Sequence, residues 1–269
     1  MSLWALTTIY PFIWVILNSF KPRGLIRSDT FSLPIGDKFT LENYVTAFKR
    51  VDIGTAYVNS IVISGAVTVV VMVLAGLAAY AMVRYSFRLR GFLHSMIIAS
   101  MMFPVFSTII PVFRMESSWG IVNTGSIWLT RLSVVLPQIA GNLSFAIIVL
   151  MGFIRSLPVD LEEAAYLEGY NVYQIFFRII MPLAKPSFAT VGIFTFLWSY
   201  NDRFLQMFFL RSKKFFTITR LLNEISSQAG TNYGLMVAAV VMVVIPVLVV
   251  YIFLQNYIIK GMTAGAVKG

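Results

Sequence analysis

Six long stretches of this chain carry no charged side chain, and this segregation of charge limits the chain to a fold built in lipid. The charge-free stretches are 1–20, 53–83, 91–113, 132–154, 186–201 and 225–259. A helix that crosses the hydrocarbon core of a bilayer needs about 20 apolar residues, and each stretch reaches or approaches that length. Only 12% of the residues are charged, against about 25% in soluble domains.

Lipid offers no hydrogen-bonding partner to an unpaired backbone group, so the spans are predicted to be helices. We therefore expect an all-α polytopic membrane protein that forms one transmembrane domain over residues 1–269. The six predicted spans are 3–20, 57–83, 91–112, 127–153, 186–210 and 234–259. The connection 154–185 is a short charged segment between two spans.

The first apolar stretch differs from a signal peptide. It has no basic region in front of it and no small-residue cleavage site behind it, and Lys21, Pro22 and Arg23 follow it directly. We predict that it is a true span. Because the apolar run begins almost at residue 1, we expect that a polar N-terminal leader is missing from the sequence.

Several kinds of chemistry have no residues to support them. The chain has no cysteine and one histidine, His94, and a lone histidine is more often a packed side chain than a ligand. The phosphate-binding pattern G-x-x-x-x-G-K-[ST] and the zinc motif H-E-x-x-H are both missing. We expect no catalytic residue, no metal site and no cofactor bound by this chain.

The connection 154–185 is predicted to contain two short helices. Pro158 prevents the fourth span from continuing, and Asp160 with Glu163 has the spacing of a capping box at the start of a new helix. Gly169 is suited to end that helix, because glycine tolerates the left-handed conformation found there. The first half of the connection is thus a short capped helix.

Asn171 and Gln174 repeat the capping pattern and start a second short helix, and Pro182 and Pro186 precede the fifth span. The result is a stiff helix-turn-helix. Taken alone, such a segment could also be an amphipathic loop that lies at the membrane interface without a partner.

The full string resembles the coupling loop of importer permeases in the ATP-binding-cassette (ABC) superfamily. The family pattern is Glu-Ala-Ala, two residues, Asp-Gly, an apolar stretch and Leu-Pro; this chain has Glu168 in place of the Asp and Met181 in place of the Leu. The resemblance implies the type I importer permease fold, with 154–185 as a cytoplasmic coupling loop. The residues that it assigns to ATPase coupling are Asp160, Glu162, Glu163, Ala164, Ala165, Glu168, Gly169 and Pro182.

The resemblance extends to both ends of the chain. Residues 10–22 look like the first span of carbohydrate-importer permeases, and residues 261–269 resemble the C-terminal tail of the second permease subunit of maltose-type importers. In that family the tail reaches between the ATPase subunits, which implies that Gly265 and Lys268 contact them. With its basic outer loops, the chain is most similar to the permeases that import alginate, an acidic polysaccharide.

The same resemblance implies the partners and the location. We expect a heterodimer with a sibling permease, two ATPase subunits that hydrolyse ATP with Mg²⁺, a periplasmic solute-binding protein, and membrane lipid, but no nucleic acid. The location would be the bacterial inner membrane, with both termini cytoplasmic. Charge counting does not settle this orientation, since the loops on the coupling side hold eight basic residues and the opposite loops hold twelve.

The loops opposite the coupling loop carry a net positive charge. They hold twelve basic and seven acidic residues, a difference of five. This excess can attract an acidic solute or docking partner, or it can be a solvated surface beside anionic lipid headgroups. A neutral oligosaccharide therefore stays an alternative substrate.

Polar residues near or inside spans are costly in lipid and are therefore candidates for a substrate pathway. The candidates are Asn142, Trp198, Tyr200, Asn201 and Arg203. The competing explanation is that they make helix–helix contacts or anchor the chain at the membrane interface.

A self-sufficient secondary transporter is the alternative from a different functional class. Such a protein should show internal repeats and a buried carboxylate for ion coupling. The sequence shows no convincing repeat between its halves, and apart from the fifth its predicted spans contain no acidic residue.

Overall fold

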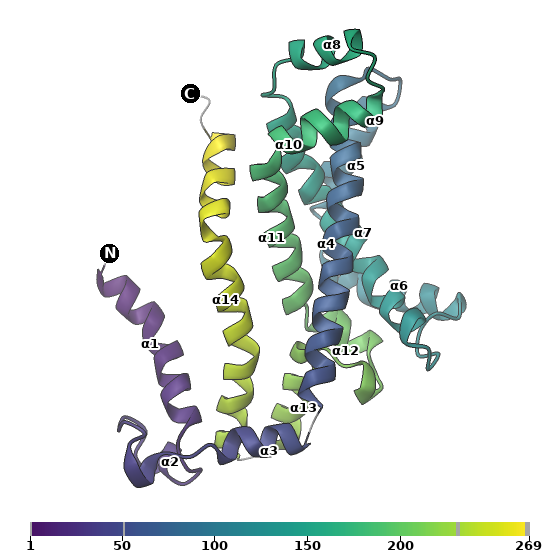
Figure 1. Ribbon diagram of the computed structural model, residues 1–269. Coiled ribbons are helices and arrows are strands. Elements are labelled where there is room, and N and C mark those ends of the chain that lie inside the picture. The colour runs from purple at the N-terminus through teal and green to yellow at the C-terminus, as the bar shows by residue number, and fades with distance from the viewer. Residues whose placement is uncertain (1, 51, 230–231, 267–269) are drawn as a thin grey trace. The chain divides into compact units, whose positions relative to one another are not determined.

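The structure, a computed structural model, describes residues 2–50, 52–229 and 232–266, and within these ranges it contains helices and turns but no strand. This confirms the prediction of an all-α chain. The chain divides into two compact units, which are described separately: Met1–Ser60 with Leu210–Tyr251, and Ile61–Phe209 with Ile252–Gly269. Figure 1 labels the helices along the chain.

The first unit consists of apolar helices and a polar loop region. Its elements are α1 (Ser2–Ser19), α2 (Leu25–Ser28), the 3-10 turn Gly36–Lys38, α3 (Glu42–Arg50), the start of α4 (Ile53–Arg84), the 3-10 turn Lys213–Phe215, α13 (Ile218–Ala229) and most of α14 (Tyr233–Ala266). The side-chain amide of Asn43 donates to the carbonyls of Ser19 and Lys21 at 2.9 and 2.8 Å. This amide therefore fastens α3 to the end of α1.

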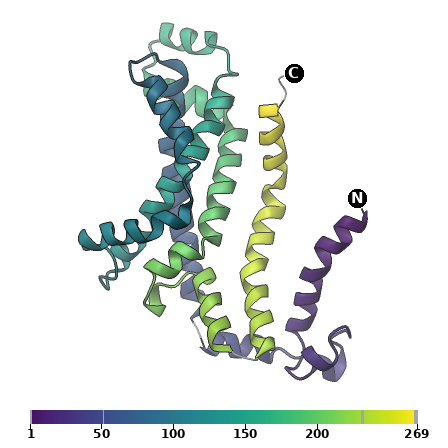
Figure 2. The same cartoon turned by 180° about the vertical axis from the view of Figure 1, so that it is seen from behind.

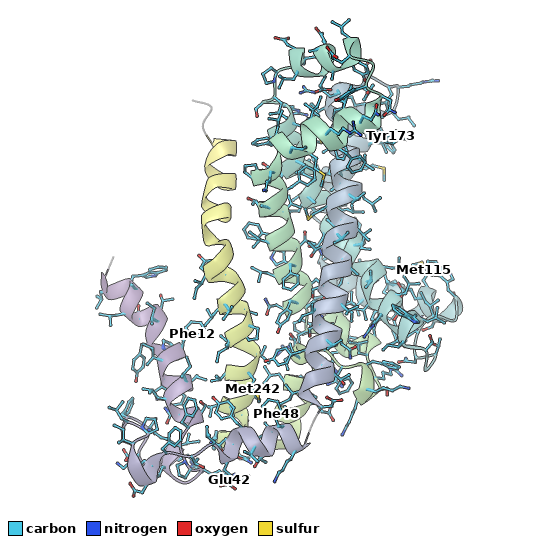
Figure 3. The ribbon with its side chains drawn as sticks, in the orientation of Figure 1. Phe12, Glu42, Phe48, Met115, Tyr173 and Met242 are labelled. Carbon is cyan, nitrogen blue, oxygen red and sulfur yellow. The ribbon has the colours of Figure 1, made fainter. Side chains whose placement is uncertain are left out.

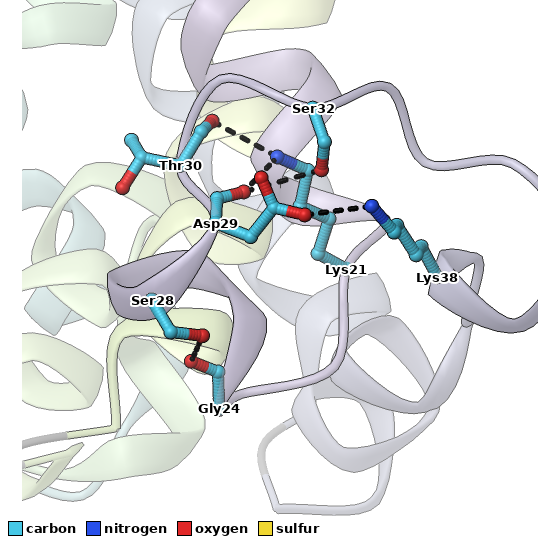
Figure 4. Close-up of polar contacts among 7 residues, drawn as sticks. All are labelled: Lys21, Gly24, Ser28, Asp29, Thr30, Ser32 and Lys38. Carbon is cyan, nitrogen blue, oxygen red and sulfur yellow. Dashed lines mark hydrogen bonds and ion pairs between the residues drawn. The ribbon is translucent and has the colours of Figure 1, made fainter.

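Lys21 organises the loop that follows α1. Its side chain is fully buried, and Nζ donates to the carbonyls of Asp29 and Thr30, both at 2.9 Å (Figure 4). Beside it, Lys38 and Asp29 form an ion pair at 2.7 Å, and the hydrogen bond from Lys38 lowers the pKa of the Asp29 carboxyl. Lys21 thus holds the backbone of this loop, and Lys38 pairs with one of its carboxylates.

The second unit contains the segment 154–185 and the helices that pack against it. Its elements are the rest of α4, α5 (Arg90–Ser100), α6 (Val105–Ser118), α7 (Ile127–Ile154), α8 (Asp160–Leu167), α9 (Val172–Ile175), the π-helical turn Phe176–Ile180, α10 (Met181–Leu183), α11 (Lys185–Asn201) and α12 (Phe204–Phe209). Helices α7 and α11 run side by side (Figures 1 and 2). One apolar core joins α4, α7, the α8–α10 region and the start of α11.

Four of the predicted spans coincide with continuous helices. By length and composition, α4 and α7 can each cross a membrane, while Leu3–Ser19 and Tyr233–Val249 are shorter apolar helices. The pair Val172–Leu183 and Lys185–Asn201, bent by 82°, is a third candidate for a span.

Two predicted spans are interrupted as helices. The predicted span 91–112 breaks after Ser100 and resumes at Val105, with Pro104 at the end of the gap. The predicted span 186–210 ends as a helix at Asn201. In both places a polar or proline residue interrupts the ladder of backbone hydrogen bonds while the composition stays apolar.

Candidate functional site

The first helix of the coupling loop has a different start from the one predicted. Asp160 is the first helical residue and does not cap the helix; Val159 precedes it, and no side chain makes a cap hydrogen bond. The Val159 carbonyl instead accepts from the backbone N–H groups of Glu162 and Glu163 at 2.8 and 3.1 Å. The predicted capping box is therefore wrong, but acidic residues in the first turn still complement the helix dipole.

The end of α8 matches the prediction. Gly169 has φ of +83°, in the left-handed region, and its N–H donates to the Tyr166 carbonyl at 3.0 Å. The next N–H, of Tyr170, donates to the carbonyl of Ala165, also at 3.0 Å. A glycine is needed for its backbone freedom rather than for space, because a Cβ here would meet nothing within 4 Å.

The second predicted capping box is confirmed. The backbone N–H of Asn171 donates to the side chain of Gln174 at 2.8 Å, and the N–H of Gln174 donates to the Asn171 side chain at 2.9 Å. After α9 the chain makes the π-helical turn Phe176–Ile180, and Pro182 lies in the short α10 that leads to α11.

A buried ion pair fastens α8 to the end of α4. Glu162 is 4% exposed, and its carboxylate accepts from Arg84 Nε at 2.5 Å and from the Tyr80 hydroxyl at 2.7 Å. Arg84 also donates to the Leu157 carbonyl at 2.9 Å. We call Tyr80, Arg84, Glu162 and the Leu157 carbonyl the Arg84 clamp. It places the turn after α4 and the coupling loop at the same end of the second unit.

Sequence reasoning did not identify Tyr80 and Arg84 as part of this site. The available signal was an arginine at the end of an apolar helix and a glutamate in the coupling loop, but the two residues are 78 positions apart. Nothing in the spacing pairs them. The predicted coupling residue Glu162 faces its own chain and not solvent.

The opposite face of α8 is exposed. Glu163, Ala164 and Glu168 face solvent, and Leu167 is 92% exposed; we call these four residues the α8 face. Ala165 points the other way and is buried in the core. Tyr173 of α9, labelled in Figure 3, is also strongly exposed. Large exposed apolar side chains beside carboxylates are typical of a surface that docks a partner.

The five candidate pathway residues do not form one cluster. Asn142 is buried and donates to the Gln138 carbonyl at 2.7 Å, and Tyr200 is buried as well. Trp198 is half exposed, with its ring against Phe145 at a centroid distance of 4.8 Å. The remaining two are exposed: Asn201 donates to the Leu197 carbonyl, and Arg203 lies over the ring of Phe204.

Asp202, next to these residues, explains the break between α11 and α12. Its carboxylate accepts from the Gln138 side-chain amide at 3.0 Å and from the Leu205 backbone N–H at 3.1 Å. The Gln138 side chain in turn accepts from the Ser199 hydroxyl at 2.5 Å. This polar network joins α7 to the break, and sequence reasoning did not predict it.

A cavity of about 480 Å³ lies in the second unit, between the α5–α6 break, α6, α7 and α12. None of the five candidate pathway residues lines it. Glu116 of α6 does. We call it the Glu116 cavity.

The predicted ATPase-contacting tail is described only in part. Gly265 lies in the last turn of α14, and Lys268 is outside the described residues. The prediction for the tail therefore rests on the sequence.

The decisive comparison covers most of the chain. Residues 42–264 match the family of binding-protein-dependent transport system inner membrane components. The chain belongs to this family.

Three relatives agree with the assignment. They are the diacetylchitobiose uptake system permease protein NgcG of Streptomyces coelicolor (34% identical, covering 100% of this chain and 87% of the relative), the melibiose/raffinose/stachyose import permease protein MelC of Bacillus subtilis (31%, 96% and 91%) and the trehalose transport system permease protein SugB of Mycobacterium tuberculosis (32%, 97% and 93%).

A solved structure shares the fold of this inner membrane component. It is that of a bacterial ABC transporter involved in the import of the acidic polysaccharide alginate, which matches with a TM-score of 0.81 at 24% identity over 95% of this chain and 92% of that chain. The predicted importer permease fold is thereby confirmed.

Proposed function

We propose that this chain is a permease subunit of an ATP-driven carbohydrate importer and that the α8 face receives the movement of an ATPase subunit. The observation that carries the proposal is the two-sided coupling loop, exposed on the α8 face and fastened to α4 by the Arg84 clamp. A stiff element with one docking side and one anchored side can pass a displacement to a membrane helix. Three relatives named as permeases or import proteins for sugars support the substrate class.

The roles of the loop residues follow from their exposure. We assign Glu163, Leu167 and Glu168 to direct contact with the ATPase, because their side chains are accessible. Asp160 and Ala164 border that contact. The buried Glu162 is a positioning residue.

The remaining loop residues set the shape of the loop. The buried Ala165 fills the core beneath α8, Gly169 ends α8, and Pro182 leads the chain toward α11. We also propose that the tail residues Gly265 and Lys268 contact the ATPases.

The sequence has no motif for binding ATP, which implies partner proteins. No phosphate-binding loop occurs in the sequence, so ATP and Mg²⁺ would be bound and hydrolysed by two separate subunits. One coupling loop per chain implies a sibling permease. A second solved structure with the same fold, at 18% identity and a TM-score of 0.70, is of an alginate transporter in complex with a pentasaccharide-bound periplasmic protein, which supports a periplasmic binding protein as a further partner. We place the chain in the bacterial inner membrane, with both termini on the coupling-loop side.

An acidic polysaccharide such as alginate is the first candidate substrate. The loops opposite the coupling loop have five more basic than acidic residues, which favours a negatively charged solute. The fold neighbour that imports alginate agrees with this choice. Among the pathway candidates, Arg203 is an exposed cation, and Trp198 and Asn201 lie near it in sequence; we propose that these three border the path, while Asn142 and Tyr200 support it from within.

A neutral oligosaccharide is the second candidate. The relatives that are at least 30% identical include proteins named for diacetylchitobiose, trehalose, and melibiose, raffinose and stachyose. None of these sugars carries a carboxylate. The two candidates differ in charge and can be separated by one uptake assay.

The test is transport by the assembled importer. The chain would be co-expressed with a sibling permease, an ATPase and a binding protein, and the complex placed in proteoliposomes. We expect ATP-dependent uptake of a labelled oligosaccharide. Uptake driven by an ion gradient through this chain alone, without ATPase, would instead show a secondary transporter.

A further inference from the structure

The Glu116 cavity has the size of a ligand site. Its volume of about 480 Å³ falls within the range of roughly 300–1,000 Å³ typical of small-molecule sites. Most of its lining is apolar, and no Lys or Arg of the described residues contributes to it. One ring of a small organic molecule would fit, provided that the polar atoms of the wall find partners.

Glu116 is the polar group that most needs a partner. Its residue is 1% exposed, and its Oε2 has no hydrogen-bond partner in the described part of the chain. A buried carboxylate oxygen that is left unpaired is costly. A ligand that donates hydrogen bonds into the cavity would remove this cost.

Aromatic side chains line the same cavity. Phe103 and Trp119 both contribute to its lining and are 69% and 57% exposed. One face of a sugar ring consists of C–H groups and can pack on an aromatic ring, whereas the hydroxyls at the ring edge donate hydrogen bonds. Aromatic rings together with an acceptor carboxylate match these two kinds of sugar surface.

The α7 side of the Glu116 cavity is lined mostly by small residues. Pro137, Ala140 and Gly141 follow one another along this side. A Cβ built on Gly141 would meet nothing within 4 Å. A larger side chain at Gly141 would therefore enter the cavity without displacing its neighbours.

We propose that the Glu116 cavity binds one ring of a neutral, hydroxyl-rich sugar, with Glu116 accepting hydrogen bonds from the hydroxyls and an aromatic side chain packing on the C–H face. The inference rests on the proposed carbohydrate-import function and selects the second of its two substrate candidates. A uronate ring would bring a second carboxylate close to Glu116, with no cation in the lining to separate the two charges.

The experiment uses the complete importer in proteoliposomes, with labelled raffinose as the neutral probe and a labelled oligouronate as the acidic probe. Glu116→Gln keeps the size of the side chain and removes its charge, and we expect raffinose uptake to fall roughly tenfold, as for the loss of a hydrogen bond to a charged group. Gly141→Val places a larger side chain in the cavity and should strongly reduce uptake. Gly152→Val is the matched control, because Gly152 lies on the same helix, is exposed and is outside the cavity; uptake should stay unchanged.

The possible failures are distinguishable. If the unaltered importer takes up neither probe nor any other carbohydrate, the proposed function is wrong. If it takes up raffinose and both cavity variants match the control, only the cavity inference is wrong. Uptake of the oligouronate alone would also overturn it. So would loss of the sibling permease from the purified complex in both variants, since the cavity would then be a subunit interface.

Discussion

At the scale of single residues, the coupling loop depends on two positions with different physical demands. Gly169 is required for a backbone conformation, with φ of +83°. Arg84 is required for charge, because it neutralises a glutamate that is 4% exposed. The first demand is local and the second joins segments far apart in the chain.

Replacing Gly169 with valine should impair coupling. A β-branched residue in the left-handed region costs on the order of 1–2 kcal/mol, so the end of α8 would shift and the α8 face would turn away from its partner. We expect reduced ATPase co-purification and reduced ATP-dependent uptake. Gly24→Val is the control, since Gly24 has φ of −63° and open space around it. Equal ATPase recovery from both variants would contradict the assignment.

Removing Arg84 should destabilise the second unit. Arg84→Met leaves Glu162 buried without its cation, which costs roughly 3–5 kcal/mol for a buried pair. We expect a lower melting temperature of the purified protein in detergent. The double variant Arg84→Met with Glu162→Met should recover much of that loss, because no buried charge remains. A double variant that is as unstable as the single one would show that the clamp acts through packing alone.

Changing the charge of the α8 face is a separate test. Glu163 is exposed, so Glu163→Lys should leave folding and membrane insertion unchanged while it weakens ATPase recruitment. The measurement is co-purification of the ATPase together with the melting temperature of the permease. Unchanged recruitment at low ionic strength, where charge effects are largest, would argue against contact at this residue.

At the scale of helices, close packing against α4 depends on a glycine, Gly76, which has no side chain. A Cβ on Gly76 would approach the Phe188 ring to 2.8 Å and the Phe176 ring to 3.0 Å. The two rings come from the start of α11 and from the π-helical turn. Gly76 therefore lets the π-helical turn and the start of α11 approach α4 closely.

Gly76→Ala should accordingly destabilise the protein. We expect a loss of roughly 1–3 kcal/mol from overpacking, measured as thermal stability in detergent. The matched control is Gly65→Ala on the same helix, where a Cβ meets nothing within 4 Å. That change should be neutral or stabilise the helix by up to about 1 kcal/mol. Similar losses from both changes would mean that the rings move aside.

How far the sequence predicts these elements depends on the range of the interaction. The Gly169 terminus and the Asn171 capping box could be predicted because each involves neighbouring residues. The break at Pro104 had a local signal, but the apolar composition on both sides concealed it. The Arg84 clamp and the Glu116 cavity could not be predicted, since each forms only when helices distant in sequence pack together.

At the scale of the whole chain, the testable prediction is the arrangement of loops across the bilayer. The chain has no cysteine, so single introduced cysteines can report which side each loop faces. Ser86 and Ser156 lie on the coupling-loop side of the predicted topology, and Ser117 and Ser212 lie on the other; all four are exposed.

We expect a membrane-impermeant thiol reagent added outside intact spheroplasts to label Ser117→Cys and Ser212→Cys. It should label Ser86→Cys and Ser156→Cys only after the membrane is opened. Broken cells serve as the control that all four thiols react. Labelling of Ser156→Cys from outside would place the coupling loop on the wrong side for an ATPase.

The π-helical turn Phe176–Ile180 makes the coupling loop more sensitive to an added residue than to a substituted one. Its wider winding holds one residue more than a regular α-helical turn. Inserting a further residue there would rotate everything that follows by about 100°. The aromatic ring of Phe188 would then swing out of the gap left by Gly76, so substitutions here should be tolerated far better than insertions.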